Sequence, residues 1–416
     1  MKFIYKIISE IFLILSPIII LYRILKKKEN PKRFFERYAI TSKIRKKGKL
    51  IWFHCSSVGE LLSIIPIVEK FENNKKIKQI LITTTTLSSS KIFETIKFKK
   101  TQHQFFPIDN DLIINKFLNY WKPSIFFLCE SEIWPNLIYN IKQKKIKLIL
   151  LNGRMTLKSF KRWKVIQLFS REIFKKFNTC FAQNQETYKR LFLLGAKKVK
   201  YIGNLKFTTR KKAKFDTLNK QKLNFFKNKK ILITAASTHY NEENFVFQNH
   251  LYFKNKKSIN KLISIIVPRH IERSGQIKKE AENYSLKTHM HSSKKKINRD
   301  SEVYIVDTYG ELNKFYKISN LVFMGGSLIN HGGQNPLEPA KLGCKIIHGP
   351  NISNFKEIYN KLGRMEVSIL FKKYLDGSKI IERNFSSKNS FLLRKRLAKY
   401  GNQILNSTYF ELNKFI

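Results

Sequence analysis

Glu60 is the residue whose type and position most directly suggest catalysis. It ends the stretch His54-Cys55-Ser56-Ser57-Val58-Gly59-Glu60, which follows a short apolar run and precedes a helical pattern. A glutamate at such a place can act as a general base, and Gly59 would let a substrate approach the backbone closely. The same residues fit an S-x-x-E capping box, in which Glu60 only stabilises the first helical turn. Both interpretations stay open at this point.

Two further polar motifs follow apolar runs in the first half of the chain. Glu130-Ser131-Glu132-Ile133-Trp134-Pro135-Asn136 carries two carboxylates, and a helix is expected to begin at Pro135. A cap and a turn explain one carboxylate but not the other, which favours a functional role, whereas support for a Mg²⁺ site is weak. Gly203-Asn204-Leu205-Lys206-Phe207 comes later. Lys206 is either solvated or placed to contact a phosphate or carboxylate.

Four motifs in the second half of the chain suggest anion binding. They are Pro268-Arg269-His270, Asp307-Thr308-Tyr309-Gly310-Glu311, Gly325-Gly326-Ser327 and His331-Gly332-Gly333-Gln334-Asn335-Pro336-Leu337-Glu338-Pro339-Ala340. Arg269 is either a solvated loop charge or a guanidinium fork for phosphate. We expect Asn335 as a helix N-cap, Pro336 as the first helical residue and Glu338 closing a capping box, so that backbone N–H groups face a phosphate. Together the motifs predict a nucleotide-type ligand.

Metal and nucleophile chemistry is not predicted. The nine histidines are dispersed, and Cys55, Cys129, Cys180 and Cys344 form no C-x-x-C pair. This excludes a structural zinc site and a disulfide-stapled fold, and indicates reduced thiols. The sequence contains no G-x-S-x-G elbow, no P-loop and no G-x-G-x-x-G after the first apolar run. A dinucleotide-dependent dehydrogenase is therefore not expected.

All of these motifs stand where short apolar runs end. Such runs occupy residues 50–55, 79–86, 124–130, 147–152, 179–184 and 199–204, and the rhythm restarts at 231–237, 263–269, 302–308, 321–327 and 345–350. Apolar strands that alternate with helices form parallel sheets covered on both faces, and ligands bind at the strand ends. We predict an α/β chain with two Rossmann-like domains facing across a cleft. The predicted parts are residues 33–207 (N-terminal domain), 208–230 (linker), 231–390 (C-terminal domain) and 391–416 (helix).

The first 32 residues form a separate segment. Ile7 to Leu25 is apolar apart from a few positions, and Lys26, Lys27, Lys28, Lys32, Arg33 and Arg37 follow it. Basic residues after an apolar segment keep that side in the cytoplasm. No small-residue cleavage site precedes the basic cluster, so we expect an uncleaved membrane anchor rather than a signal peptide. The sequence does not separate a single span from a helix lying in the membrane plane, and a buried helix of the first domain is the alternative.

Charge is the most unusual property of this 416-residue chain. It has 81 Lys and Arg against 29 Asp and Glu, a formal net charge of +52. The lysines are spread along the whole chain, and Lys, Asn, Ile and Phe are abundant together, as a biased genome would produce. We therefore expect no specific nucleic-acid partner, and attraction to an anionic membrane surface or substrate instead.

The motifs also carry a resemblance to a known family. HCSSVGE, ESEIWPN, NGRM, GNLKF, AASTH-x-x-EE, VPRH-x-x-R, DTYGEL, GGS and HGGQNPLEPA occur in this order. In the identity and order of these motifs, the chain resembles 3-deoxy-D-manno-octulosonic acid (Kdo) transferases, the lipid A glycosyltransferases of lipopolysaccharide synthesis. The resemblance runs from about residue 33 to the C-terminal helix and includes the apolar N-terminus. It implies a GT-B fold at the bacterial inner membrane, with the catalytic domains on the cytoplasmic side.

The resemblance further implies what the motif residues do. The N-terminal domain would bind a lipid A precursor (lipid IVA) and the C-terminal domain CMP-Kdo, for an inverting transfer without a metal or cofactor. Glu60 matches the family's catalytic base, and Glu130 and Lys206 match positions for transition-state stabilisation. The CMP-binding positions match Pro268, Arg269, Tyr309, Gly310, Glu311, Asn335, Pro336, Leu337 and Glu338. The alternatives are a GT-B enzyme that uses a UDP-sugar, or a basic protein that binds membranes or nucleic acid on a relict fold.

Overall fold

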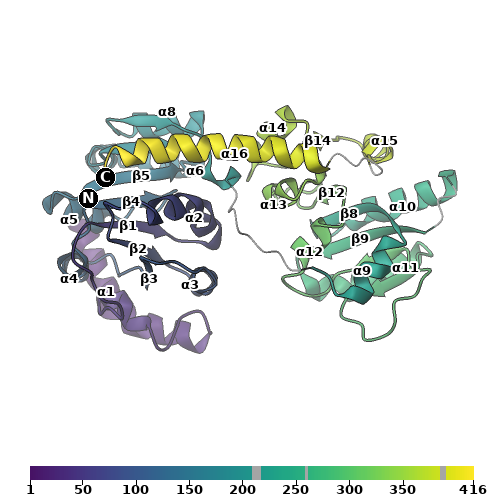
Figure 1. The fold of residues 1–416 in the computed structure, drawn as a ribbon, viewed down its shortest axis with the longest axis horizontal. Coiled ribbons are helices and arrows are strands. Elements are labelled where there is room, and N and C mark those ends of the chain that lie inside the picture. The colour runs from purple at the N-terminus through teal and green to yellow at the C-terminus, as the bar shows by residue number, and fades with distance from the viewer. Residues whose placement is uncertain (209–216, 258–260, 385–389) are drawn as a thin grey trace. The chain divides into compact units, whose positions relative to one another are not determined.

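The computed structural model describes residues 1–208, 217–257, 261–384 and 390–416 of the chain. Contacts between residues divide the chain into two compact units. Unit 1 comprises Met1–Lys211 and Tyr400–Ile416, and unit 2 comprises Lys212–Lys399. Both ends of the chain therefore belong to unit 1 (Figure 1).

Unit 1 is built on a parallel sheet, which has seven strands in the described residues, in the order β3-β2-β1-β4-β5-β6-β7. The strands are β1 (Leu50–Cys55), β2 (Gln79–Thr84), β3 (Thr101–Phe105), β4 (Ile125–Cys129), β5 (Lys147–Gly153), β6 (Thr179–Ala182) and β7 (Val199–Tyr201). The helices between them are α2 (Val58–Glu72), α3 (Leu87–Glu94), α4 (Asp111–Trp121), α5 (Pro135–Gln143), α6 (Leu157–Val165), α7 (Gln167–Phe174) and α8 (Gln185–Leu193). The turn η2 (Leu205–Phe207) follows β7.

Unit 2 repeats the same architecture. Its parallel sheet also has seven strands in the part of the chain that is described, in the order β10-β11-β9-β8-β12-β13-β14. The strands are β8 (Lys230–Thr238), β9 (Leu262–Pro268), β10 (Thr288–Met290), β11 (Val303–Ile305), β12 (Leu321–Met324), β13 (Lys345–His348) and β14 (Ser368–Leu370). The helices are α9 (Lys220–Lys227), α10 (Glu243–Lys257), α11 (Ser274–Asn283), α12 (Leu312–Tyr316), α13 (Leu337–Lys341), α14 (Lys356–Arg364), α15 (Tyr374–Asn384) and the first part of α16 (Ser390–Asn413), with the turn η3 (Ile271–Arg273) after β9.

The predicted α/β class with two Rossmann-like sheets is confirmed, and every apolar run named above contains a strand. Three strands were not predicted: β3, β10 and β14. Polar side chains dominate β3, and β10 and β14 have only three residues each, so none shows a continuous apolar run. Part of the stretch expected as a linker forms α9, whose Phe226 is buried in unit 2. Residues 209–216 of that stretch lie outside the described part of the chain.

The second part of α16 packs on unit 1. The Lys70 ammonium donates to the side-chain oxygen of Asn406 at 2.9 Å, and the rings of Phe71 and Tyr409 lie 5.0 Å apart. Tyr400 meets Phe207 edge-to-face at 5.2 Å. These contacts join the C-terminal helix to α2 and η2, the two elements that contain Glu60 and Lys206.

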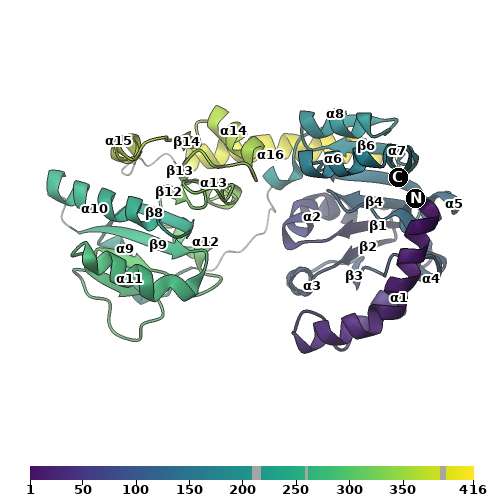
Figure 2. The same cartoon turned by 180° about the vertical axis from the view of Figure 1, so that it is seen from behind.

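Helix α1 (Lys2–Leu25) lies against unit 1 through its polar side chains, beside α4 (Figure 2). The Tyr5 hydroxyl donates to Asp109 at 2.7 Å, and Asn110 donates to the Glu10 carboxylate at 2.8 Å. Ile20 is buried, but most of the apolar side chains of α1 are exposed: Phe3, Ile4, Ile7, Ile8, Ile11, Phe12, Ile14, Leu15, Ile18, Leu21 and Leu25. By length and composition α1 could cross a membrane, but its polar contacts tie it to the folded unit.

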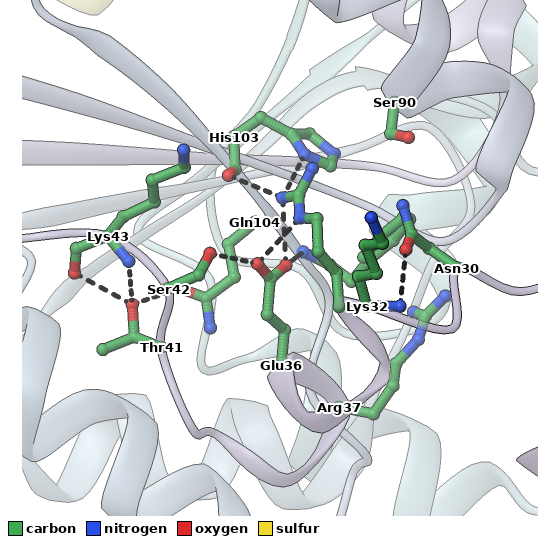
Figure 3. A network of polar contacts seen from close by, with 12 residues as sticks. Asn30, Lys32, Glu36, Arg37, Thr41, Ser42, Lys43, Ser90, His103 and Gln104 are labelled. Carbon is green, nitrogen blue, oxygen red and sulfur yellow. Dashed lines mark hydrogen bonds and ion pairs between the residues drawn. The ribbon is translucent and has the colours of Figure 1, made fainter.

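A buried ion-pair network fixes the segment between α1 and β1. Glu36 lies in the turn η1 (Phe34–Tyr38), fully buried, and accepts from Arg33 at 2.9 and 3.1 Å, from the backbone of Phe105 at 2.7 Å and from Ser42. Arg33 also donates to the backbone oxygen of His103 at 3.0 Å. Figure 3 shows the Glu36 carboxylate directed toward Ser42. The network attaches η1 to the edge strand β3.

The same region contains Arg37, which the sequence analysis counted among the basic residues that follow the apolar segment. Its side chain is buried and paired with Glu29 at 3.2 Å. Its guanidinium also donates to the backbone oxygens of Thr85 and Phe106. Burial lowers the pKa of Arg37, and the charge of Glu29 opposes that effect. Arg37 therefore stabilises unit 1, and Lys26, Lys27, Lys28 and Lys32 remain as the exposed basic residues after α1.

Replacing Glu36 by glutamine should destabilise unit 1 by about 3–5 kcal/mol, because it leaves the Arg33 charge without its buried partner. Urea unfolding followed by circular dichroism measures the change. Glu94→Gln is the matched control. The Glu94 carboxylate also lies 3.6 Å from the Arg33 guanidinium, but the Glu94 side chain is exposed. That variant should cost less than about 1 kcal/mol. Equal losses in the two variants would contradict a structural role for the Glu36 network.

Candidate active site

The carboxylate of Glu60 is held at the start of α2, directly after β1. Ser57 is the N-cap, and its hydroxyl accepts from the Glu60 backbone N–H at 3.3 Å. The Glu60 carboxylate accepts from the Ser56 backbone N–H at 2.8 Å and from the Ser57 hydroxyl at 3.0 Å. The predicted cap is therefore present. It fixes the carboxylate in one orientation, which a general base also requires.

The surroundings of Glu60 change its acidity. Burial raises the pKa of Glu60 to about 7, and the negative charges of Glu130 and Glu132 add to this effect. The hydrogen bonds from Ser56 and Ser57 act in the opposite direction, because they favour the carboxylate. A carboxyl group with a pKa near neutrality can take up a proton and release it at neutral pH. The arrangement is suited to general base catalysis.

Glu130 and Lys206 form an ion pair beside Glu60. The Lys206 ammonium lies 2.7 Å from the Glu130 carboxylate, which is almost fully buried. Glu130 follows β4 and Lys206 lies in the turn η2, so the pair joins two strand ends of the same sheet. Glu60 lies in the first helical turn after β1 and Glu130 directly follows β4, and these two strands are neighbours in the sheet, so both carboxylates lie at the same sheet edge. The structure thus brings together the three residues predicted to be catalytic.

Asn152 is a site residue that the sequence analysis did not single out. Its side-chain amide donates to Glu130 at 3.3 Å, and its side-chain oxygen accepts from the backbone of Leu205 at 2.9 Å. Asn152 lies in the left-handed region with φ 53°, at the end of β5. Asn152 therefore connects the turn η2, which carries Lys206, to the carboxylate of Glu130. The motif Asn152-Gly153-Arg154-Met155 was the available signal, because it also follows an apolar run.

Unit 2 places Arg269 at the end of β9. Pro268 is the last residue of the strand, and the Arg269 backbone N–H donates to Thr238 at 3.0 Å. The Arg269 side chain is exposed, and within the described residues it has no ion-pair partner. An unpaired guanidinium at a strand end is available for an anionic ligand.

The segment 309–311 forms a turn with two differently directed side chains. The exposed Tyr309 hydroxyl donates to Glu272 at 3.1 Å, whereas the Glu311 carboxylate lies 3.0 Å from the Lys314 ammonium and 3.6 Å from His291. Gly310 has φ 85°, which favours glycine. The backbone of the turn is thus open to a ligand, while both side chains have partners within the protein.

A buried carboxylate that was not predicted as a site residue shapes the glycine loop after β12. Glu242 accepts hydrogen bonds from the backbone N–H groups of Gly326 at 2.6 Å and of Ser327, Leu328 and His239 at 3.0 Å each. A side chain could not replace the hydrogen of Gly325, since a Cβ there would lie 2.2 Å from the Ser237 oxygen. The motif AASTH-x-x-EE contained Glu242 but gave no indication of this role.

The helix predicted to begin at Pro336, with Asn335 as its N-cap, begins one residue later. Helix α13 has five residues, its N-cap is Pro336, and the Asn335 side-chain oxygen accepts from the backbone of Leu337 at 3.1 Å. Glu338 is exposed and closes no capping box, because it stands two residues after the N-cap instead of three. A helix this short also has a weak dipole, so it adds little to the binding of an anion.

No three His, Cys, Asp or Glu side chains among the described residues form a group that could hold a metal ion. The four cysteines are buried as free thiols. Cys55 and Cys129 end the neighbouring strands β1 and β4 with their sulfur atoms 3.5 Å apart, and burial raises the pKa of both. They pack below the carboxylates and are not placed for thiolate chemistry.

Known proteins are similar to the chain in sequence and in fold. The family model of 3-deoxy-D-manno-octulosonic-acid transferase (kdotransferase) matches residues 32–209. A 3-deoxy-D-manno-octulosonic acid transferase of Rickettsia bellii is 33% identical over 373 residues, which are 88% of this chain and 87% of the relative. A probable mitochondrial 3-deoxy-D-manno-octulosonic acid transferase of Arabidopsis thaliana is 32% identical and covers 86% of this chain and 82% of the relative.

A solved structure supports the fold alone. A putative UDP-N-acetylglucosamine 2-epimerase from Listeria monocytogenes is 10% identical, with a TM-score of 0.58, and covers 88% of this chain and 97% of that structure. The predicted GT-B class, with two Rossmann-like units, is confirmed by the two parallel sheets and this likeness.

Replacing Glu130 by glutamine should lower the pKa of Glu60, because after burial the Glu130 charge is the strongest influence that raises it. Carboxyl carbon shifts in an NMR titration measure the change, with Glu60→Gln to assign the signal. Glu69→Gln, on the same helix but absent from the influences on Glu60, is the control. A Glu60 pKa that stays the same or rises in Glu130→Gln would show that the two carboxylates are not coupled.

Proposed function

Since the chain belongs to the family of 3-deoxy-D-manno-octulosonic acid (Kdo) transferases, we propose that it transfers Kdo from CMP-Kdo to a lipid A precursor, with inversion at the anomeric carbon. The observation that carries this proposal is the Glu60 carboxylate, which is oriented by a helix cap and has a pKa of about 7. A base of this kind is what activation of a sugar hydroxyl requires.

The proposed reaction is a single displacement. Glu60 takes the proton of an acceptor hydroxyl while that oxygen attacks the anomeric carbon of Kdo. The bond from the anomeric carbon to the phosphate oxygen breaks, and CMP leaves with the bonding electrons. Attack and departure on opposite faces invert the centre, through a transition state with oxocarbenium character.

Glu130 and Lys206 would stabilise this transition state. A carboxylate near the anomeric carbon offsets the positive charge that develops there, and the interaction is strong because Glu130 is shielded from water. Lys206 balances the Glu130 charge at 2.7 Å, and Asn152 holds the turn that carries it. The two residues act as a preorganised pair, since their positions are fixed before substrate arrives.

The donor would bind to unit 2. The unpaired guanidinium of Arg269 is suited to the phosphate of CMP, and the turn 309–311 and the segment 335–338 supply the other contacts. Glu242 fixes the loop Gly326–Leu328 through its backbone N–H groups. With Arg269 to hold the phosphate charge, the proposed transfer needs no metal ion and no cofactor.

Location at the membrane is part of the proposal. The exposed apolar side of α1 and the exposed Lys26, Lys27, Lys28 and Lys32 suit the interface of an anionic bilayer. Polar contacts hold α1 on unit 1 along its length, from Tyr5–Asp109 to the hydroxyls of Ser16 and Tyr38 at 3.0 Å. A spanning helix would carry these unit 1 residues into the hydrocarbon. We therefore propose that α1 lies in the membrane plane, on the cytoplasmic side of the bacterial inner membrane.

The transfer is tested by incubating the protein with CMP-Kdo and a tetra-acylated lipid A precursor, followed by mass spectrometry. The wild type should add Kdo, and UDP-sugars should not replace CMP-Kdo. Glu60→Gln should lower kcat by about 10²–10⁴-fold, because it removes the base, and should keep the affinity for CMP.

Arg269→Ala is the complementary variant in the same assay. It should weaken CMP binding by about 1.5–3 kcal/mol, since a charge-assisted contact is lost, and calorimetry measures this directly. Failure of the wild type to add Kdo would refute the proposed function. Glu60→Gln with more than about a tenth of the wild-type kcat would refute the role of Glu60 alone.

The placement of α1 is tested with an epitope tag before Met1. The protein is bound to the outside of anionic vesicles and treated with a protease that cannot enter them. A helix in the membrane plane leaves the tag on the outer side, so the protease should remove it as completely as it does in detergent. A tag protected by intact vesicles would show that α1 spans the bilayer.

A further inference from the structure

Unit 2 contains a cavity of about 520 Å³ outside the residues used above, apart from Glu311. It lies where β10 and β11 end, beside the first turn of α9. Ligands bind at the carboxyl ends of parallel strands, and a volume of this size is typical of small-molecule sites. Neither Tyr309 nor Arg269 lines it, and the Tyr309 hydroxyl is directed to Glu272 instead.

The charges at this cavity favour an anion. Lys222, Lys294 and Lys295 line it, and Glu311 is the one carboxylate among the lining residues. Glu311 is already paired with Lys314 at 3.0 Å. The histidines add little charge, because burial and Lys222 lower the pKa of His291 to about 4. An excess of positive charge therefore remains for a ligand.

Lys222 is the best-positioned cation. Its ammonium lies 3.1 Å from the backbone oxygen of His291 and 3.1 Å from a nitrogen of the His291 ring. The Tyr304 hydroxyl lies 3.0 Å from the Nδ1 atom of the same ring. An ammonium group has three donors, so one is left for a ligand after these two contacts. Lys222 is thus fixed in position, in contrast to the exposed lysines of the loop.

The cavity also has hydroxyl donors. The Thr308 hydroxyl oxygen is buried and has no hydrogen-bond partner within the described residues. A buried polar atom without a partner is rare in folded proteins and indicates a missing ligand or water. Ser292 lies on the opposite loop, where both its backbone N–H and its hydroxyl donate to Asp307. That contact fixes the loop that carries Lys294 and Lys295.

We propose that this cavity binds the phosphate group of a small soluble phosphorylated molecule, at a site separate from the donor site. Ammonium groups and hydroxyls are the donors that bind phosphate oxygens in proteins. The volume exceeds what a bare phosphate fills, so the molecule carries a further polar part of about the size of a sugar or a nucleoside. The site is independent of the proposed transfer, since it uses none of the residues assigned to the reaction and only the side chain of Glu311 from the donor segments.

Calorimetry with inorganic phosphate, in the presence of saturating CMP, isolates this site from the donor site. The wild-type protein should bind phosphate, and Lys222→Gln should weaken that binding by about tenfold or more. Lys220→Gln is the matched control, because Lys220 is exposed in the same helical turn and does not line the cavity. It should leave phosphate binding unchanged, and both variants should keep the CMP affinity.

A second pair of variants, at exposed positions, distinguishes a loss of phosphate binding from a loss of folding. Lys295 and Lys296 are exposed neighbours, but only Lys295 lines the cavity, so Lys295→Gln should weaken phosphate binding and Lys296→Gln should not. No phosphate binding in the presence of CMP, or equal losses in the matched variants, would overturn the proposal. Displacement of phosphate by phosphatidate vesicles would show that the cavity binds a lipid headgroup, which would contradict the proposal of a soluble ligand. A joint loss of CMP and phosphate affinity in Lys222→Gln would place the cavity in the donor site.

Discussion

Burying two carboxylates at the ends of neighbouring strands is the constraint on which the organisation of unit 1 depends. β1 and β4 pair in register, so the residues that follow Cys55 and Cys129 emerge at the same edge of the sheet. Glu130 is balanced by Lys206, whereas the partners of the Glu60 carboxylate among the described residues are the hydrogen-bond donors of Ser56 and Ser57. Charged groups shielded from water are costly unless paired, and the raised pKa of Glu60 is the consequence. The unpaired carboxyl is the one suited to accept a proton.

Unit 2 also buries carboxylates, but there each buried carboxylate has partners that compensate its charge. Glu242 is fully buried, and four backbone N–H groups around its carboxylate compensate for the lost water. Glu243 is paired with Arg273 at 3.0 and 3.2 Å. Their partners make both carboxylates structural, and they fix loops at the strand ends. Arg269 remains without an ion-pair partner in the described part of the unit, so the group left over for a ligand is a cation.

The sequence predicted the features that follow from apolar runs and their ends. Strands such as β1 match the predicted run completely, and Glu60, Glu130 and Lys206 were chosen because each follows such a run. The edge strand β3 was missed because four of its five side chains are polar, although most of them are buried, so it contains no continuous apolar run. Asn152 and Glu242 were missed as well, since their roles depend on backbone groups far away in the sequence. The burial of Arg37 was not predicted either, because a local count of charges does not show that it pairs with Glu29 inside unit 1.

Glu60 is proposed to act as the base, with a pKa that its environment raises to about 7. The pH dependence of kcat/KM for Kdo transfer tests this role most directly, because this quantity reports groups that titrate in the free enzyme. The base must be ionised to accept a proton, so kcat/KM should be low in acid and rise as pH passes about 7. A profile that stays flat from about pH 5 to pH 8, or that falls as pH rises through 7, would contradict the claim.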